Sequence, residues 1–222
     1  MERSQLIKLL SGKEAEAIIR TLAMMAYNPA IGRVLEKGGV ERFADLMVET
    51  VPRFYGTVNR ERFDTTHTET CERILASFKT NRGGSVSYGQ AQKPLNVFLK
   101  VYVDWAKQPG QELAEKLTPL LHVPLDSLLM QFMAREFPEG YKTKIAPLRR
   151  QFAERVAERL GQYKPRTVEQ ALLGTEFSLV GINKQVYLAW QELLRSLYPG
   201  KPVALDIIWM LERTRLREAT TR

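Results

Sequence analysis

Apolar residues recur along most of this chain at the three- and four-residue spacing of an amphipathic helix. The clearest stripe is formed by Val40, Phe43, Leu46, Met47 and Val51. Similar stripes end at Gly, Pro or Asn breakers. Together they predict helices over 13–26, 30–37, 40–51, 58–79, 111–117, 145–160 and 182–198, and one that a cap at Asp126 or Ser127 begins and that ends at Phe137.

A further helix is indicated by a capping pattern. Ser87 and Gln90 have the spacing of a capping box, in which each side chain bonds the backbone N–H of the other residue. The pattern predicts a helix from this point to about Ala106. Pro94 lies inside it and lacks a backbone N–H, so it should kink the helix or postpone its start.

Strand patterns are sparse. Segment 177–180 could be extended, and 203–209 fits either a strand or a helix. The sequence therefore predicts an all-α fold: one multi-helix globular bundle over 1–222, with little or no sheet. The glycine-containing loop at 80–86 is the candidate position for a subdivision of that domain.

Composition excludes several classes of protein. With 44% hydrophobic and 26% charged residues, the chain has the balance of a globular protein. It lacks an uncharged stretch of about 20 residues, and its first residues do not resemble a signal peptide. We therefore expect a cytoplasmic protein that does not act at a membrane. One cysteine and two histidines offer few soft ligands, so we expect no metal and no cofactor.

The formal net charge of +8 points to an anionic partner. Much of the excess lies between Lys142 and Arg166, where eight cations face only Glu154 and Glu158. This spacing predicts a surface that follows phosphates, although a solvated helix face would have the same composition. The expected nucleic-acid-binding residues are Arg149, Arg150, Arg155, Arg159, Lys164 and Arg166.

The sequence has no phosphate-binding loop, paired CxxC, GxSxG or HExxH motif. It does have Arg62-x4-His67, which resembles the active motif of the HEPN superfamily, helical bundles that often act as metal-independent ribonucleases. The resemblance implies that His67 transfers a proton and that Arg62 stabilises charge. The alternative is a structural histidine, because His67 and Cys71 are one helical turn apart.

A second polar row follows in segment 87–105, where glutamine, lysine and asparagine share a helix face. A stretch of about 65 residues resembles a group of uncharacterised bacterial proteins through three segments, FDTTHTETC, SYGQAQKPLN..LK and HVPLDS. That group is similar to genes found in mobile or defence-related neighbourhoods. The resemblance implies a site that binds a ligand or phosphate, whereas a polar seam between helices would need the same residues. The candidate residues are Gln92, Lys93, Asn96, Lys100, His122 and Asp126.

Three functional hypotheses follow. The first is a basic protein that binds a nucleotide or a nucleic acid, with RNA expected ahead of DNA. If this protein is an enzyme, we expect metal-independent ribonuclease activity in bacterial antiviral defence. The second is a non-catalytic subunit that docks an acidic protein partner, with Trp190 and Trp209 as anchors if they are exposed. The third is an enzyme for a small anionic metabolite. The sequence leaves enzymatic activity and oligomeric state open.

Overall fold

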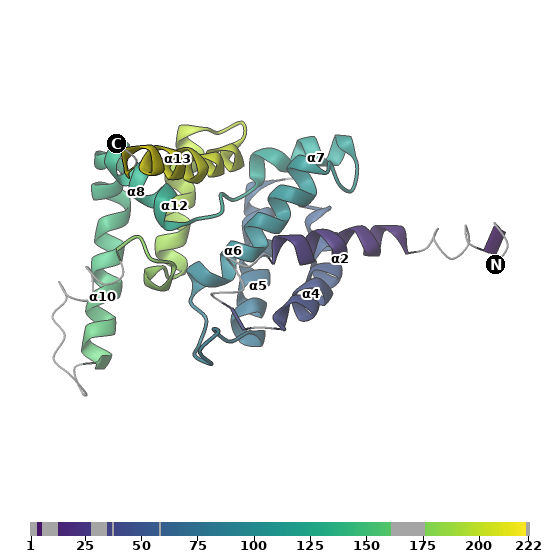
Figure 1. Cartoon of the computed structure of the whole chain (residues 1–222), viewed down its shortest axis with the longest axis horizontal. Helices are drawn as coiled ribbons and strands as arrows, with labels where there is room; N and C mark the ends of the chain where they lie inside the picture. Colours follow the sequence, from purple (N-terminus) through teal and green to yellow (C-terminus); the bar gives the residue numbers. More distant parts are fainter. Residues whose placement is uncertain are drawn as a thin grey trace. The chain divides into compact units, whose positions relative to one another are not determined.

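Helical backbone makes up most of the chain that the structure describes (Figure 1). The structure is a computed structural model, and it describes residues 4–5, 13–27, 35–36, 38–57, 59–160 and 176–220, with only the backbone described for 155–160 and 219–220. Within these ranges the extended pairing is limited to two isolated β-bridges, Leu35 with Thr80 and Lys79 with Ser85. The predicted all-α fold is confirmed.

The helices pack into two compact units. Unit 1 comprises the described residues of Met1–Ser85 and Pro94–Leu120, and unit 2 those of Val86–Lys93 and Leu121–Arg222. The chain first passes from one unit to the other after Ser85, in the loop at 80–86. The prediction of a single domain over 1–222 stays a prediction.

Unit 1 has an aromatic core. Phe43 lies 6.5 Å from Phe98, ring centre to ring centre, and Phe54 lies 5.2 Å from Phe63. These rings are fully buried and join the helices of the unit. Its elements are α2 (Glu14–Ala26), α4 (Gly39–Phe54), α5 (Arg60–Ser77), the end of α6 (Tyr88–Leu99), the π-helical turn η1 (Lys100–Trp105), α7 (Gln111–Leu117) and η2 (Thr118–Leu120).

Unit 2 is built around α12, whose Val186, Tyr187, Trp190 and Leu194 are fully buried. Because Trp190 is enclosed, it cannot anchor a partner, whereas Trp209 is half-buried. The elements are the start of α6, α8 (Ser127–Glu136), α9 (Pro138–Gly140), the π-helical turn η3 (Tyr141–Ile145), α10 (Ala146–Leu160), η4 (Leu179–Gly181), α12 (Lys184–Leu197), η5 (Pro202–Ile207) and α13 (Ile208–Thr220).

Several helix ends differ from the sequence prediction. Helix α4 continues through Pro52 to Phe54, since a proline removes only the one hydrogen bond that its own N–H would make. Helical backbone before α10 begins at Pro138, well before 145, because proline is favourable in the first turn of a helix. Segment 177–180 forms a turn and η4 instead of a strand. Segment 203–209 is helical.

The predicted helix at 30–37 lies mostly outside the described residues. Leu35 and Glu36 are not helical, and Glu36 N–H donates to the Lys79 carbonyl at 3.0 Å. Gly38 follows with a φ of 81°, a left-handed conformation that favours glycine, and α4 begins directly after it. Leu35 and Glu36 are therefore not part of a helix before α4.

No helix in the described ranges combines the length and the apolar character needed to cross a membrane.

Candidate functional site

Helix α6 begins at the predicted capping box. The Gln90 side chain accepts from Ser87 N–H at 2.9 Å, and the Ser87 hydroxyl oxygen accepts from Gln90 N–H at 3.2 Å. The Ser87 hydroxyl also donates to the Leu179 carbonyl at 2.8 Å. The start of α6 is therefore not postponed by Pro94, which lies inside the helix.

Gly89, the second residue of α6, allows a close approach within unit 2. Its N–H donates to the Ile182 carbonyl at 3.1 Å. A Cβ atom at this position would lie 2.3 Å from the Leu179 carbonyl oxygen and 2.8 Å from Ile182 Cβ. Only glycine fits here, because both neighbours are too close for any side chain. The glycine of the GQAQK block thus has a packing role.

Two buried glutamines hold the connector 121–126 by its backbone. Gln191 on α12 accepts from Val123 N–H and donates to the Val123 carbonyl, both at 2.9 Å. Gln92 on α6 does the same for Leu125, with both distances at 3.4 Å, and also donates to the Gly89 carbonyl at 2.9 Å. We call this arrangement the connector clamp. It satisfies the backbone of a buried loop that has no regular structure.

The connector also contains His122 and Asp126, two of the predicted ligand-binding residues. His122 is buried, and its Nδ1 lies 2.6 Å from the Tyr187 hydroxyl. Asp126 accepts from Leu129 N–H at 2.9 Å and so caps α8, which decides between the two caps that the sequence left open, Asp126 and Ser127. Its second carboxylate oxygen lies 3.2 Å from Lys93 Nζ, and both side chains are only partly exposed.

Unit 2 therefore brings Gln92, Lys93, His122 and Asp126 together around the connector. Each of them has a structural partner there: a backbone group, a carboxylate, a hydroxyl or a helix end. Gln191 and Tyr187 belong to the same cluster, and the sequence analysis missed them. Gln191 could have been found from the sequence, because it is a polar residue within the apolar face of α12, between Trp190 and Leu194.

Unit 1 contains the other candidate polar residues. His67 is fully buried, and its Nε2 lies 2.6 Å from Asn96 Oδ1. Because that oxygen can only accept, Nε2 carries the proton, and Nδ1 faces the Cys71 thiol at 3.8 Å. Lys100 lies in η1, with its Nζ 4.7 Å from the centre of the Trp105 ring, a cation–π contact.

The structure does not bring Arg62 and His67 together. Residues five apart on a helix point about 140° away from each other around its axis. Arg62 is exposed and lines an open polar groove of about 670 Å³, whereas His67 lies in the core. The other groove residues are Arg53, Gly56, Thr57, Asn59, Glu61, Thr65, Thr66 and Glu69. In this arrangement His67 cannot contact a substrate that binds beside Arg62.

In the basic segment that begins at Lys142, each cation whose side chain the structure describes lies close to a carboxylate. Lys142 lies 3.3 Å from Glu139, and Arg150 lies 3.6 Å from Glu154. Lys144 lies 3.5 Å from Glu192, a carboxylate from outside the segment. These three cations are exposed, so each pair contributes only about 0–1 kcal/mol.

Arg149 corrects the predicted basic surface, because only 7% of it is exposed. Its guanidinium donates to the Tyr141 hydroxyl at 2.7 Å and lies 3.6 Å from Glu176. Desolvation, the largest effect, raises the pKa of Tyr141, and the Arg149 guanidinium opposes this rise. Of the remaining predicted residues, Arg155 and Arg159 lie on α10 with undescribed side chains, and Lys164 and Arg166 lie outside the described residues.

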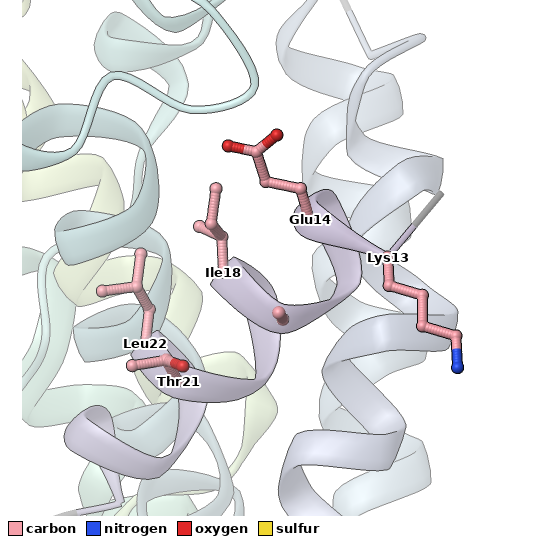
Figure 2. Close-up of a pocket in the computed structure, with 6 residues that line it drawn as sticks. Lys13, Glu14, Ile18, Thr21 and Leu22 are labelled. Carbon is pink, nitrogen blue, oxygen red and sulfur yellow. The ribbon is translucent and has the colours of Figure 1, made fainter. Parts of the chain in front are cut away.

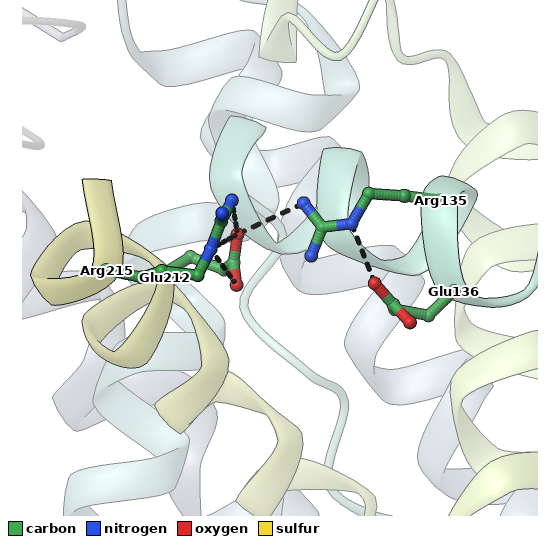
Figure 3. Close-up of polar contacts among 4 residues, drawn as sticks. All are labelled: Arg135, Glu136, Glu212 and Arg215. Carbon is green, nitrogen blue, oxygen red and sulfur yellow. Dashed lines mark hydrogen bonds and ion pairs between the residues drawn. The ribbon is translucent and has the colours of Figure 1, made fainter. Parts of the chain in front are cut away.

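An acidic residue of α13 is held between two arginines (Figure 3). Glu212 is nearly buried, and its carboxylate lies 3.3 Å from the Arg135 guanidinium on α8 and 2.9 Å from that of Arg215. The two hydrogen-bonding guanidinium groups lower the pKa of Glu212. Arg135 also donates to Glu136 at 2.7 Å. This cluster holds α13 against α8 within unit 2.

A second open groove, of about 490 Å³, lies along α2 (Figure 2). Its lining is mostly apolar and, among the described residues, comes from this helix alone: Lys13, Glu14, Ala17, Ile18, Thr21 and Leu22. The described residues contain no group of three or more His, Cys, Asp or Glu side chains placed to hold a metal ion. Neither observation identifies a ligand.

Comparison with known proteins gives no relative: no family model, no curated protein and no solved structure matches this chain.

Proposed function

We propose that this chain binds nucleic acid through exposed cations of unit 2, without cleaving it. The distribution of charge between the units supports this proposal. Counted over the full sequence, the segments of unit 2 (86–93 and 121–222) contain 17 lysine and arginine residues against 11 aspartate and glutamate residues, a net charge of +6. The segments of unit 1 (1–85 and 94–120) contain 16 against 14, a net charge of +2. A concentrated positive charge attracts a phosphate backbone and releases its counterions.

The pairing of Lys142, Lys144 and Arg150 is compatible with this role. Their ion pairs are exposed and weak, so a phosphate can replace each carboxylate at little cost. Their partners Glu139, Glu192 and Glu154 would then be left in water, where they remain solvated. RNA ahead of DNA is proposed from the sequence resemblance of Arg62-x4-His67 to the HEPN motif alone, because these two residues lie apart in unit 1 and take no part in the unit 2 surface.

Ribonuclease activity has less support than binding. The proton-transfer residue that the resemblance implies, His67, is fully buried and bonded to Asn96. A general acid or base must come within hydrogen-bonding distance of the reacting group.

The test is the salt dependence of RNA binding by the full chain. Binding of the chain to a labelled single-stranded RNA is measured by fluorescence anisotropy at several salt concentrations between about 50 and about 200 mM. The test variant is Lys142→Gln/Lys144→Gln/Arg150→Gln. The control is Arg42→Gln/Arg53→Gln/Arg73→Gln, which removes the same charge from three exposed, ion-paired arginines of unit 1.

We expect the test variant to bind RNA more weakly and to reduce the slope of log K against log salt by about 2, because each lost phosphate contact contributes about 0.7 on single strands. The control variant should stay close to wild type. Equal losses in both variants would mean that overall charge alone governs binding, and the proposal would then be wrong. Specific RNA cleavage by wild type would refute the non-catalytic part.

A further inference from the structure

An apolar stripe runs from Ile207, the last residue of η5, along the outward side of α13. Ile207, Met210 and Leu211 are 54%, 49% and 60% exposed, and Thr214 continues the line at the i, i+3, i+4, i+7 spacing. The Thr214 hydroxyl donates to the Met210 carbonyl at 3.0 Å, so it is bonded within the helix. This spacing is the one by which helices dock to each other through one face.

The orientation of the stripe is set by the other side of the helix. Glu212 is held by Arg135 of α8, which turns that side of α13 inward (Figure 3). Met210 and Leu211 lie about 160° and 100° around the helix axis from Glu212. They are therefore presented to solvent by a contact that is itself nearly buried.

Exposed apolar side chains elsewhere in unit 2 are isolated. Phe137, Val180 and Tyr198 are exposed one at a time, in different segments, and Leu216, 45% exposed, lies on α13 but outside the stripe. Single exposed apolar residues are normal, whereas a contiguous group on one helix face marks an interaction site. The stripe is therefore a candidate site for docking.

Charge identifies the kind of partner. Arg213 and Arg217, both exposed, run along one edge of the stripe, and Arg215, more than half exposed, lies on the other. The exposed Glu218 follows Thr214 by one turn, so arginines outnumber carboxylates around the stripe by three to one among these residues. The carboxylate of Glu212 is already bonded to two guanidinium groups. An apolar stripe between arginines complements a helix with apolar residues on one face and carboxylates beside them.

We propose that Ile207, Met210 and Leu211, with Arg213 and Arg217, form a docking surface for an acidic amphipathic helix of a partner protein. A second copy of this chain fits poorly, since two such faces would oppose arginine to arginine. Nucleic acid fits poorly because aliphatic side chains neither pair with phosphate nor stack on bases as aromatic rings do. A membrane surface requires a wider apolar face than three residues followed by a threonine.

The experiment selects peptides from a displayed library on the immobilised full chain. The library consists of helical peptides of random charge, with apolar residues allowed at every position. We expect wild type to enrich acidic sequences with apolar residues at i and i+3 or i+4. The variant Met210→Ser/Leu211→Ser should bind the selected peptide at least tenfold more weakly, while Val180→Ser, which changes an equally exposed apolar residue, should bind it like wild type.

Charge reversal makes the test specific. The variant Arg213→Glu/Arg217→Glu should lose at least tenfold in affinity for the acidic peptide and should enrich basic sequences instead. Circular dichroism checks that each variant keeps its fold, which exposed positions permit. RNA binding by Met210→Ser/Leu211→Ser should equal that of wild type, which separates this surface from the proposed nucleic-acid site.

Other outcomes would overturn the proposal. A selection without acidic bias, or one that is insensitive to Met210 and Leu211, excludes the proposed partner. Self-association of wild type that the serine variant abolishes, measured by sedimentation, would assign the surface to a second copy. Binding to vesicles of neutral and anionic phosphatidyl lipids, lost in the same variant, would assign it to a membrane.

Discussion

The connector clamp predicts a large effect from a single buried amide. Gln191→Met keeps the length of the side chain but removes both hydrogen bonds to Val123. Each buried backbone group that loses its partner costs about 1–3 kcal/mol, so two such groups give roughly 2–6 kcal/mol. The apolar methionine offsets part of this cost, and we expect a loss of about 3 kcal/mol in the free energy of unfolding. For a chain of this length, that lowers Tm by roughly 6–12 °C.

The matched control is Gln185→Met on the same helix. Gln185 is exposed, so the same substitution should change stability by less than about 0.5 kcal/mol. Urea unfolding is measured by tryptophan fluorescence, since Trp190 is buried next to Gln191 and reports on unit 2. If Gln191→Met proves no less stable than Gln185→Met, the clamp does not stabilise the connector and our reasoning is refuted.

A third substitution tests the direction of each hydrogen bond. Gln191→Glu keeps an acceptor for the Val123 N–H, but an ionised carboxylate cannot donate to the Val123 carbonyl. Burial raises the pKa of the introduced carboxyl in the folded state. Its stabilising contribution is therefore complete below the unfolded pKa of about 4.3 and is lost as pH rises through the folded value. We expect the stability of Gln191→Glu to approach that of wild type at pH values near or below the unfolded pKa of about 4.3. The stability deficit of Gln191→Met should not depend on pH.

Three further changes test other contacts. Gly89→Ala should destabilise the protein by several kcal/mol, because its Cβ would lie 2.3 Å from a backbone carbonyl oxygen, while Gly56→Ala meets no atom within 4 Å and should be nearly neutral in thermal unfolding. Glu212→Gln should lose about 1 kcal/mol at pH 7, more than Glu218→Gln. The pKa of Glu212 is lowered, so this difference should be present above the unfolded pKa of about 4.3 and disappear as pH falls through the folded value. Asp126→Ala should cost about 1 kcal/mol in urea unfolding, and Asp126→Asn less, since asparagine retains the cap on α8.

The sequence by itself determined most of the local structure. Apolar spacing predicted α2, α4, α5, α7, α10 and α12, and the capping box at Ser87 and Gln90 placed the start of α6 correctly. The predicted cap at Asp126 or Ser127 did the same for α8. These predictions succeeded because helix periodicity and capping depend on residues only three or four positions apart. Apolar spacing did not predict α13, and the predicted helix at 30–37 is not helical at Leu35 and Glu36.

Tertiary structure decided what the polar residues do. Gln92 and Asp126 were predicted as ligand-binding residues, yet they hold a connector and cap a helix. Arg149 was expected on an exposed basic face, but it is buried, with its guanidinium beside Glu176 and the Tyr141 hydroxyl. His67 could have been catalytic or structural on its sequence spacing alone, and burial against Asn96 gives it a structural position.

The physical reason is the range of the interactions. Helical periodicity is set by residues a few positions apart. The exposure of a side chain and its hydrogen-bonding partner depend on residues tens of positions away, as Gln191 and Val123 show. The sequence therefore determined where this chain is helical and how much positive charge it carries. Only packing determined which cations and which apolar residues, including the stripe on α13, remain accessible to a partner.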